Sequence, residues 1–178
     1  MNLKEKTIAS KNIYEGKIIN VTVDTVICPN GREASREIVR HPGGVAVVPV
    51  DENGFVYMIE QYRIPYDEII LEIPAGKLER GEDPLVAAVR ELKEETGLTA
   101  EKIVPMGNFY PTVGFCDENL RMYLATGLSE GEDNPDEDEF VITRKIHIDE
   151  LIGMIIDNKI CDGKTIAALF KAREFLAK

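Results

Sequence analysis

The sequence predicts a mixed α/β fold in which an N-terminal antiparallel β hairpin precedes a larger domain of strands and helices. Two observations lead to this expectation: short runs rich in Val, Ile and Thr recur along the chain, and one strongly helical segment, residues 84–96, interrupts them. The 178 residues, 44% of them hydrophobic and 30% charged, suffice for a compact domain with a sizeable core. We expect residues 1–40 to form the hairpin region, with a role in dimerisation, and residues 41–178 to form the main domain.

The expected elements follow from local patterns along the chain. Residues 17–28 are rich in Val, Ile and Thr, Pro29-Asn30-Gly31-Arg32 forms a turn, and residues 33–40 return as the second strand. Residues 45–50 and 55–60 flank an Asn-Gly turn and predict a second, central hairpin. The remaining expected strands are residues 68–73, 103–110, 120–126 and 140–148, and the expected helices are residues 84–96, 149–157 and 165–176.

The composition argues against several classes of protein. The formal net charge of −11 repels nucleic acid, and no basic cluster offsets it. No apolar run approaches the ~20 residues that span a bilayer, and charged side chains interrupt the N-terminal segment, so neither a membrane span nor a signal peptide is expected. Cys28, Cys116 and Cys161 are odd in number and far apart, which favours a reducing cytoplasm over disulfides or a thiolate metal site.

The helix expected at residues 84–96 has well-marked ends and two different faces. Asp83 suits the N-cap, Pro84 the first helical position, and Gly97 a left-handed residue that ends the helix. At 100° per residue, an apolar face carries Leu85, Ala88, Val89 and Leu92, and another face, which we expect to be exposed, carries Glu91, Glu94 and Glu95.

The three glutamates admit two interpretations. Carboxylates this close together repel one another unless cations lie among them, and oxygen ligands suit Mg²⁺ or Mn²⁺. Glutamate-rich helix faces are also commonly solvated, and Arg90 with Glu94 has the spacing of an ordinary helical ion pair.

A longer constellation decides between them: Gly76-x5-Glu82-x7-Arg90-Glu91-Leu92-x-Glu94-Glu95-x-Gly97-Leu98. In this it resembles the Nudix hydrolases, whose box forms a loop, helix and loop inside an α/β/α sandwich. The resemblance implies that Glu91 and Glu95 ligate the divalent cation, Mg²⁺ or Mn²⁺, with Glu94 and the Ala75 carbonyl nearby. It also implies that Glu82 and Arg90 brace the loop, with Gly76 and Gly97 as structural positions and Arg90, Glu94 and Glu95 serving catalysis.

The flanking segments narrow the resemblance. The runs from Arg36 to Val45, from Glu60 to Arg63 and from Glu72 to Glu79 look like the bacterial ADP-ribose pyrophosphatase branch of that family. The branch implies cleavage of ADP-ribose to AMP and ribose 5-phosphate, with Arg63 and Glu118 holding the substrate. It also implies that an acidic Glu-x-Glu loop completes the metal site, and Glu137 and Glu139 match it. We assign Glu139 as a metal ligand and as the general base, because a mobile acidic loop can take a proton from the attacking water. A solvated loop is the alternative interpretation of the acidic stretch 133–139.

One position departs from that branch. The branch commonly has a proline immediately before the Gly-Phe or Gly-Gly element downstream of the box, but this chain has Val113 there and Pro111 two residues earlier. Proline fixes φ, so the displaced residue either preserves the pocket by a shifted restraint or reshapes it.

Three function classes follow from these patterns. The first is an ADP-ribose or other nucleotide-sugar pyrophosphatase, the second a housecleaning hydrolase of nucleoside triphosphates, and the third a non-catalytic sensor of ADP-ribose-like ligands. The favoured class acts on a small-molecule nucleotide in the cytoplasm. We also expect a homodimer in which Arg36 or Arg40 of the hairpin region reaches the partner's substrate, because an isolated hairpin is unstable in water.

Overall fold

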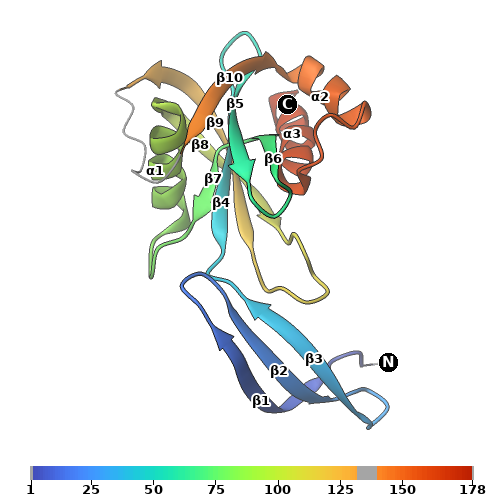
Figure 1. Cartoon of the computed structure of the whole chain (residues 1–178). Coiled ribbons are helices and arrows are strands. Elements are labelled where there is room, and N and C mark those ends of the chain that lie inside the picture. The colour runs from blue at the N-terminus through green and yellow to red at the C-terminus, as the bar shows by residue number, and fades with distance from the viewer. Residues whose placement is uncertain (1, 132–139, 178) are drawn as a thin grey trace. The chain divides into compact units, whose positions relative to one another are not determined.

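The structure is a computed structural model of the chain, and it describes residues 2–131 and 140–177. The chain divides into two compact units: residues 1–43 with 110–119, and residues 44–109 with 120–178. Within the described residues no helix is long and apolar enough to cross a membrane. Figure 1 gives the element labels used below.

The first unit is built on one antiparallel sheet of three strands. Its strands are β1 (Lys6–Glu15), β2 (Asn20–Ile27) and β3 (Glu33–Arg40), in the order β1-β2-β3. The expected hairpin is β2 with β3, and it is confirmed. The strand β1 was not expected from the sequence, because register shifts after Thr7 and after Asn12 break its side-chain alternation.

The loop formed by residues 110–119 joins this unit through β3. The Val39 amide donates to the Phe115 carbonyl at 2.7 Å, and the Asp117 amide donates to the Val39 carbonyl at 3.1 Å. The loop therefore lies beside β3, and Val39 and Cys116 form an isolated parallel β-bridge.

The second unit contains two sheets and three helices. One sheet has the order β10-β5-β6, and the other has the order β7-β4-β9-β8 with β4 and β9 parallel. The strands are β4 (Gly44–Pro49), β5 (Phe55–Arg63), β6 (Glu68–Glu72), β7 (Ala75–Lys77), β8 (Leu98–Phe109), β9 (Leu120–Glu130) and β10 (Val141–His147). The helices are α1 (Pro84–Thr96), α2 (Ile148–Ile156) and α3 (Gly163–Leu176).

The expected central hairpin of residues 45–50 and 55–60 is wrong. Gly54 does make the tight turn, with a φ of 81°, but β4 and β5 then enter different sheets and share only a bridge between Val50 and Val56. The strand β4 is buried throughout and pairs with β7 on one side and β9 on the other, which leaves no edge for β5.

Alternation along β4 produces two cores. Val45 and Val47 pack in a cluster with Ala88 and Leu92 of α1, whereas Ala46 and Val48 pack in a cluster with residues of α2 and α3. Figure 1 shows α1 on one side of these strands and α2 and α3 on the other. This is the expected α/β/α arrangement, and the mixed α/β fold class is confirmed.

Candidate active site

The helix α1 carries the candidate metal-binding carboxylates. Its expected ends are confirmed: the Asp83 side chain accepts from the amide of Leu85 at 2.8 Å, and Gly97 is left-handed with a φ of 69°. Its faces differ from the expectation, because Leu85 and Val89 are exposed. The residues that α1 buries are Ala87, Ala88, Glu91, Leu92 and Glu95.

Two box glutamates thus point inward. Glu91 and Glu95 are buried, and their carboxylates lie against the β7 backbone at Gly76 and Ala75. A buried carboxylate requires hydrogen bonds or a cation to offset its lost hydration. The burial therefore favours a functional or bracing role over a solvated helix face.

Arg90 is the positively charged side chain that bonds the carboxylates of the box. Its guanidinium donates to both Glu82 oxygens, at 3.0 and 3.1 Å, and one of its nitrogens donates to Glu91 and Glu94, at 2.8 Å each. The hydrogen bond to Glu82 is the main cause of the raised pKa of Arg90. In turn the hydrogen bond from Arg90, helped by the amide of Glu79, lowers the pKa of Glu82. Arg90 therefore remains charged and ties the loop before α1 to the helix.

The backbone of β7 approaches the carboxylate of Glu91 closely at Gly76. A Cβ atom added to Gly76 would lie only 1.8 Å from Oε1 of Glu91 and 2.2 Å from Oε2. A side chain at Gly76 would therefore fill the place that the Glu91 carboxylate occupies. Glycine is needed here for space, since no positive φ is involved.

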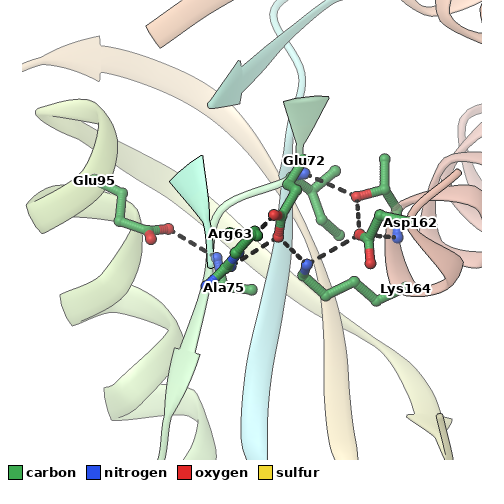
Figure 2. A network of polar contacts seen from close by, with 8 residues as sticks. Arg63, Glu72, Ala75, Glu95, Asp162 and Lys164 are labelled. Carbon is green, nitrogen blue, oxygen red and sulfur yellow. Dashed lines mark hydrogen bonds and ion pairs between the residues drawn. The ribbon is translucent and has the colours of Figure 1, made fainter. Parts of the chain in front are cut away.

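The segment before β7 is held from three elements. The amide of Ile73 donates to the hydroxyl of Thr165 in α3 at 3.0 Å, and the carbonyl of Pro74 accepts from the amide of Val47 in β4 at 2.9 Å. The amide of Ala75 donates to Oε2 of Glu95 at 2.8 Å, as Figure 2 shows. The Ala75 backbone thus lies next to one of the two buried carboxylates.

A four-charge cluster lies beside this segment (Figure 2). Arg63 binds Glu72 through two parallel hydrogen bonds, at 2.7 and 2.8 Å. The ammonium of Lys164 donates to the same Glu72 carboxylate and, at 2.9 Å, to Asp162. Burial alone would raise the pKa of Glu72, but the hydrogen bonds and charges of Arg63 and Lys164 lower it below its ordinary value.

An open cavity of about 580 Å³ borders the C-terminal end of α1. Glu94 and Glu95 lie in its wall together with aromatic and aliphatic side chains, so the cavity combines acidic and apolar surfaces. The lining residues are Glu60, Tyr62, Ile69, Glu94, Glu95, Thr96, Phe140, Val141, Ile142 and Thr143.

The candidate substrate residues of the first unit have partners within that unit. Arg36 binds Glu5, while Arg40 binds Asp24 at 3.0 Å and Asp117 at 3.2 Å. Glu118 lies 3.6 Å from Nδ1 of His41. These three assignments remain predictions, and each arginine would exchange a carboxylate partner on binding an anion.

The sequence pattern did not identify Lys164 and Asp162, and it left Glu72 without a role. Glu72 and Lys164 are 92 positions apart, so no local spacing signals the pair. The usable signal was Asp162, which is the N-cap of α3 through its bond from the Thr165 amide. The assigned base Glu139 lies outside the described residues.

The donor set suits a hard divalent cation. Glu91 and Glu95 supply buried carboxylate oxygens, and Mg²⁺ commonly binds through one or two carboxylates together with water and substrate phosphates. Among residues 2–131 and 140–177, no group of three or more His, Cys, Asp or Glu side chains is arranged to hold a metal ion. The fit to a divalent cation therefore rests on the two buried carboxylates of Glu91 and Glu95.

Comparison with known proteins assigns the family. Residues 40–169 match the NUDIX domain, and residues 5–39 match the nucleoside diphosphate sugar hydrolase N-terminal domain. The chain therefore belongs to the Nudix family, and the expected class, a Nudix hydrolase, is confirmed.

Individual relatives cover nearly the whole chain. The ADP-ribose pyrophosphatase of Bacillus subtilis (strain 168) is 44% identical over 170 residues, which is 94% of this chain and 92% of that protein. A methanol dehydrogenase activator of Bacillus methanolicus is 46% identical over 168 residues, which is 93% of this chain and 91% of that protein. A crystal structure of an ADP compounds hydrolase superposes with a TM-score of 0.84 at 22% identity, covering 98% of this chain and 95% of that one. This last likeness concerns the fold.

Proposed function

We propose that this Nudix hydrolase cleaves the pyrophosphate bond of a nucleoside diphosphate linked to another group, with ADP-ribose as the substrate and AMP and ribose 5-phosphate as products. The observation that carries the proposal is the pair of buried carboxylates, Glu91 and Glu95, held against the Ala75–Gly76 backbone. The name of the Bacillus subtilis relative supports ADP-ribose over other substrates.

The cation is proposed to be Mg²⁺, with Mn²⁺ as the alternative. Glu91 and Glu95 would hold it, with Glu94 and the Ala75 carbonyl close by. When bound, such a cation supplies neutralisation of phosphate charge and a more acidic water. Arg90 keeps Glu91 and Glu94 in place through hydrogen bonds of 2.8 Å each.

The chain's own residues supply the other roles. Arg63 presents a planar fork that suits two phosphate oxygens, and Glu118 is proposed to contact the rest of the substrate. A carboxylate from residues 133–139, for which we propose Glu139, takes the proton of the attacking water. No covalent intermediate with the protein is required.

The working form is proposed to be a cytoplasmic homodimer. All ten residues of β1 are exposed in the single chain, including Ile8, Ile13 and Tyr14. Apolar side chains and an exposed strand edge favour association with a second copy. In that dimer Arg36 or Arg40 of one chain would add positive charge to the partner's acidic site.

A substrate panel tests the proposal. The intact protein with Mg²⁺ is incubated with ADP-ribose, ADP-glucose, GDP-mannose and 8-oxo-dGTP, and the products are separated by chromatography. We expect AMP and ribose 5-phosphate from ADP-ribose at the highest kcat/KM. Faster release of pyrophosphate from the triphosphate would establish the housecleaning alternative instead. Faster turnover of GDP-mannose would point to a pocket reshaped near Pro111.

A further inference from the structure

The Glu72 carboxylate is shared by two cations that differ in exposure. The side chain of Glu72 is 3% exposed, that of Lys164 is 13% exposed, and that of Arg63 is 36% exposed. Arg63 is therefore the partner that solvent and a ligand can reach. Lys164 is enclosed between Glu72 and Asp162 (Figure 2).

We propose that Lys164 is a positioning residue that keeps Glu72 neutralised when Arg63 leaves it to bind the substrate diphosphate. This inference rests on the proposed function, because it requires that Arg63 binds phosphate oxygens of the substrate. A guanidinium fork binds carboxylate and phosphate with the same paired geometry, so the two compete for Arg63. Without Lys164, the exchange would leave a buried carboxylate unpaired, which is costly.

The position of Lys164 in α3 supports this role. It is the second residue of the helix, where the positive end of the helix dipole disfavours a cation. Its placement there depends on the two carboxylates that it bonds, Glu72 and Asp162. Asp162 is fixed by the Thr165 amide at 3.0 Å and by the Thr165 hydroxyl, so it is a rigid anchor for the ammonium.

The four-charge cluster is also connected to the backbone segment before β7. The test must separate this structural role from the transfer of Arg63 from Glu72 to the substrate phosphates. Thr165 accepts from the amide of Ile73, so α3 holds the segment that leads to Ala75 and the metal site. If Lys164 only held this segment, its loss would lower kcat and thermal stability together. If it frees Arg63, its loss would weaken substrate binding, and neutralising Glu72 would restore that binding.

The experiment compares steady-state kinetics on ADP-ribose with saturating Mg²⁺. We expect Lys164→Met to raise KM about tenfold with kcat within about twofold, the pattern of lost binding that is uniform between ground and transition states. The double variant Glu72→Gln with Lys164→Met should return KM to within about threefold of wild type, because a neutral amide needs no counter-charge. Lys164→Arg should also remain within about threefold, since it keeps the charge.

Two further variants guard against misfolding and unspecific effects. Glu72→Gln alone should lower KM, because Arg63 is then held less tightly; a raised KM in this variant would overturn the inference even if Lys164→Met did not fold. Lys171→Met removes a lysine of the same helix that bonds the Met106 carbonyl at 3.0 Å, and its KM should match wild type.

The outcomes separate the inference from the proposed function. A wild type that turns over no member of the panel overturns both. An active wild type whose Lys164→Met variant keeps a wild-type KM overturns the inference alone. So does a Lys164→Met variant whose loss lies in kcat and is not relieved by Glu72→Gln.

Discussion

Glu95 joins two functions in one side chain, since its carboxylate bonds the Ala75 amide at 2.8 Å and is proposed to hold the cation. The sequence placed it on an exposed face of the helix, yet it is buried. The amphipathic pattern misled because it cannot show that the β7 backbone lies against the two carboxylates, at Ala75 for Glu95 and at Gly76 for Glu91. Periodicity thus identified the helix and the buried positions of Ala88 and Leu92, but it missed the burial of the two glutamates.

Replacing Glu95 with Gln tests its proposed metal role. The amide oxygen can still accept from the Ala75 amide, so we expect a folded protein with its thermal midpoint close to wild type. Loss of the ligand charge should lower kcat by two orders of magnitude or more, on the order of what electrostatic stabilisation supplies. Kinetics across a Mg²⁺ titration measures the effect, and Glu174→Gln, on the exposed part of α3, is the control. Activity within a few-fold of wild type would remove Glu95 from the metal site.

Glu72 should make the stability of the protein sensitive to acid. Its pKa is lowered in the folded state, so its contribution is present above the ordinary value of 4.5 and is lost as the pH falls through the lowered value. Glu72→Gln should therefore be less stable than wild type at neutral pH and lose less stability below pH 4.5. Urea unfolding at a series of pH values measures both slopes. Glu68→Gln removes a carboxylate from the exposed end of the same strand and is the matched control. Parallel curves for Glu72→Gln and wild type would contradict the expectation.

At the scale of elements, the ends of the helices were the most predictable features. Asp83 and Gly97 mark α1 because capping is a local interaction that a few residues specify. The pairing of β4 and β5 was not predictable in the same way. Their Asn-Gly turn is local, but the choice of sheet depends on β9, which follows more than fifty residues later in the chain.

The packing of β7 against α1 gives a prediction at this scale. Gly76→Ala should push the Glu91 carboxylate away from β7, because the added Cβ would lie 1.8 Å from Oε1. We expect the Mg²⁺ concentration for half-maximal activity to rise about tenfold, which is typical when the groups that orient a metal-binding side chain are disturbed. Gly153→Ala in α2 meets no atom within 4 Å and is the matched control. It should keep wild-type activity and gain about 0.5 to 1 kcal/mol of stability from helix propensity. Equal metal dependence in both variants would show that Gly76 does not shape the site.

For the whole molecule, the sequence identified the family and its chemistry better than the partners of each charge. The Nudix box is contiguous, so its residues are recognisable together, whereas the cluster around Glu72 joins β5, β6 and the start of α3. The loop at 110–119 belongs to the first unit through bonds to Val39, a connection that no local pattern signals. Contacts between residues that are far apart in the chain are therefore the features that the sequence alone did not predict.

The last prediction concerns the oligomer. The strand β1 exposes Ile8, Ile13 and Tyr14 in the single chain, and among residues 2–131 and 140–177 it is an edge strand that pairs with β2 alone. A second copy that covers this strand would remove both features, and twofold dimers are the commonest solution among soluble proteins. We expect light scattering to give about twice the 19.9 kDa of one chain. Replacing Ile8, Ile13 and Tyr14 with Ser should shift the protein to monomer and lower kcat/KM, because Arg36 or Arg40 would no longer reach a partner's site. Ile156→Ser, which removes an exposed apolar side chain of α2, should leave the dimer intact. A wild type that is monomeric and fully active would refute both the dimer and the proposed role of its arginines.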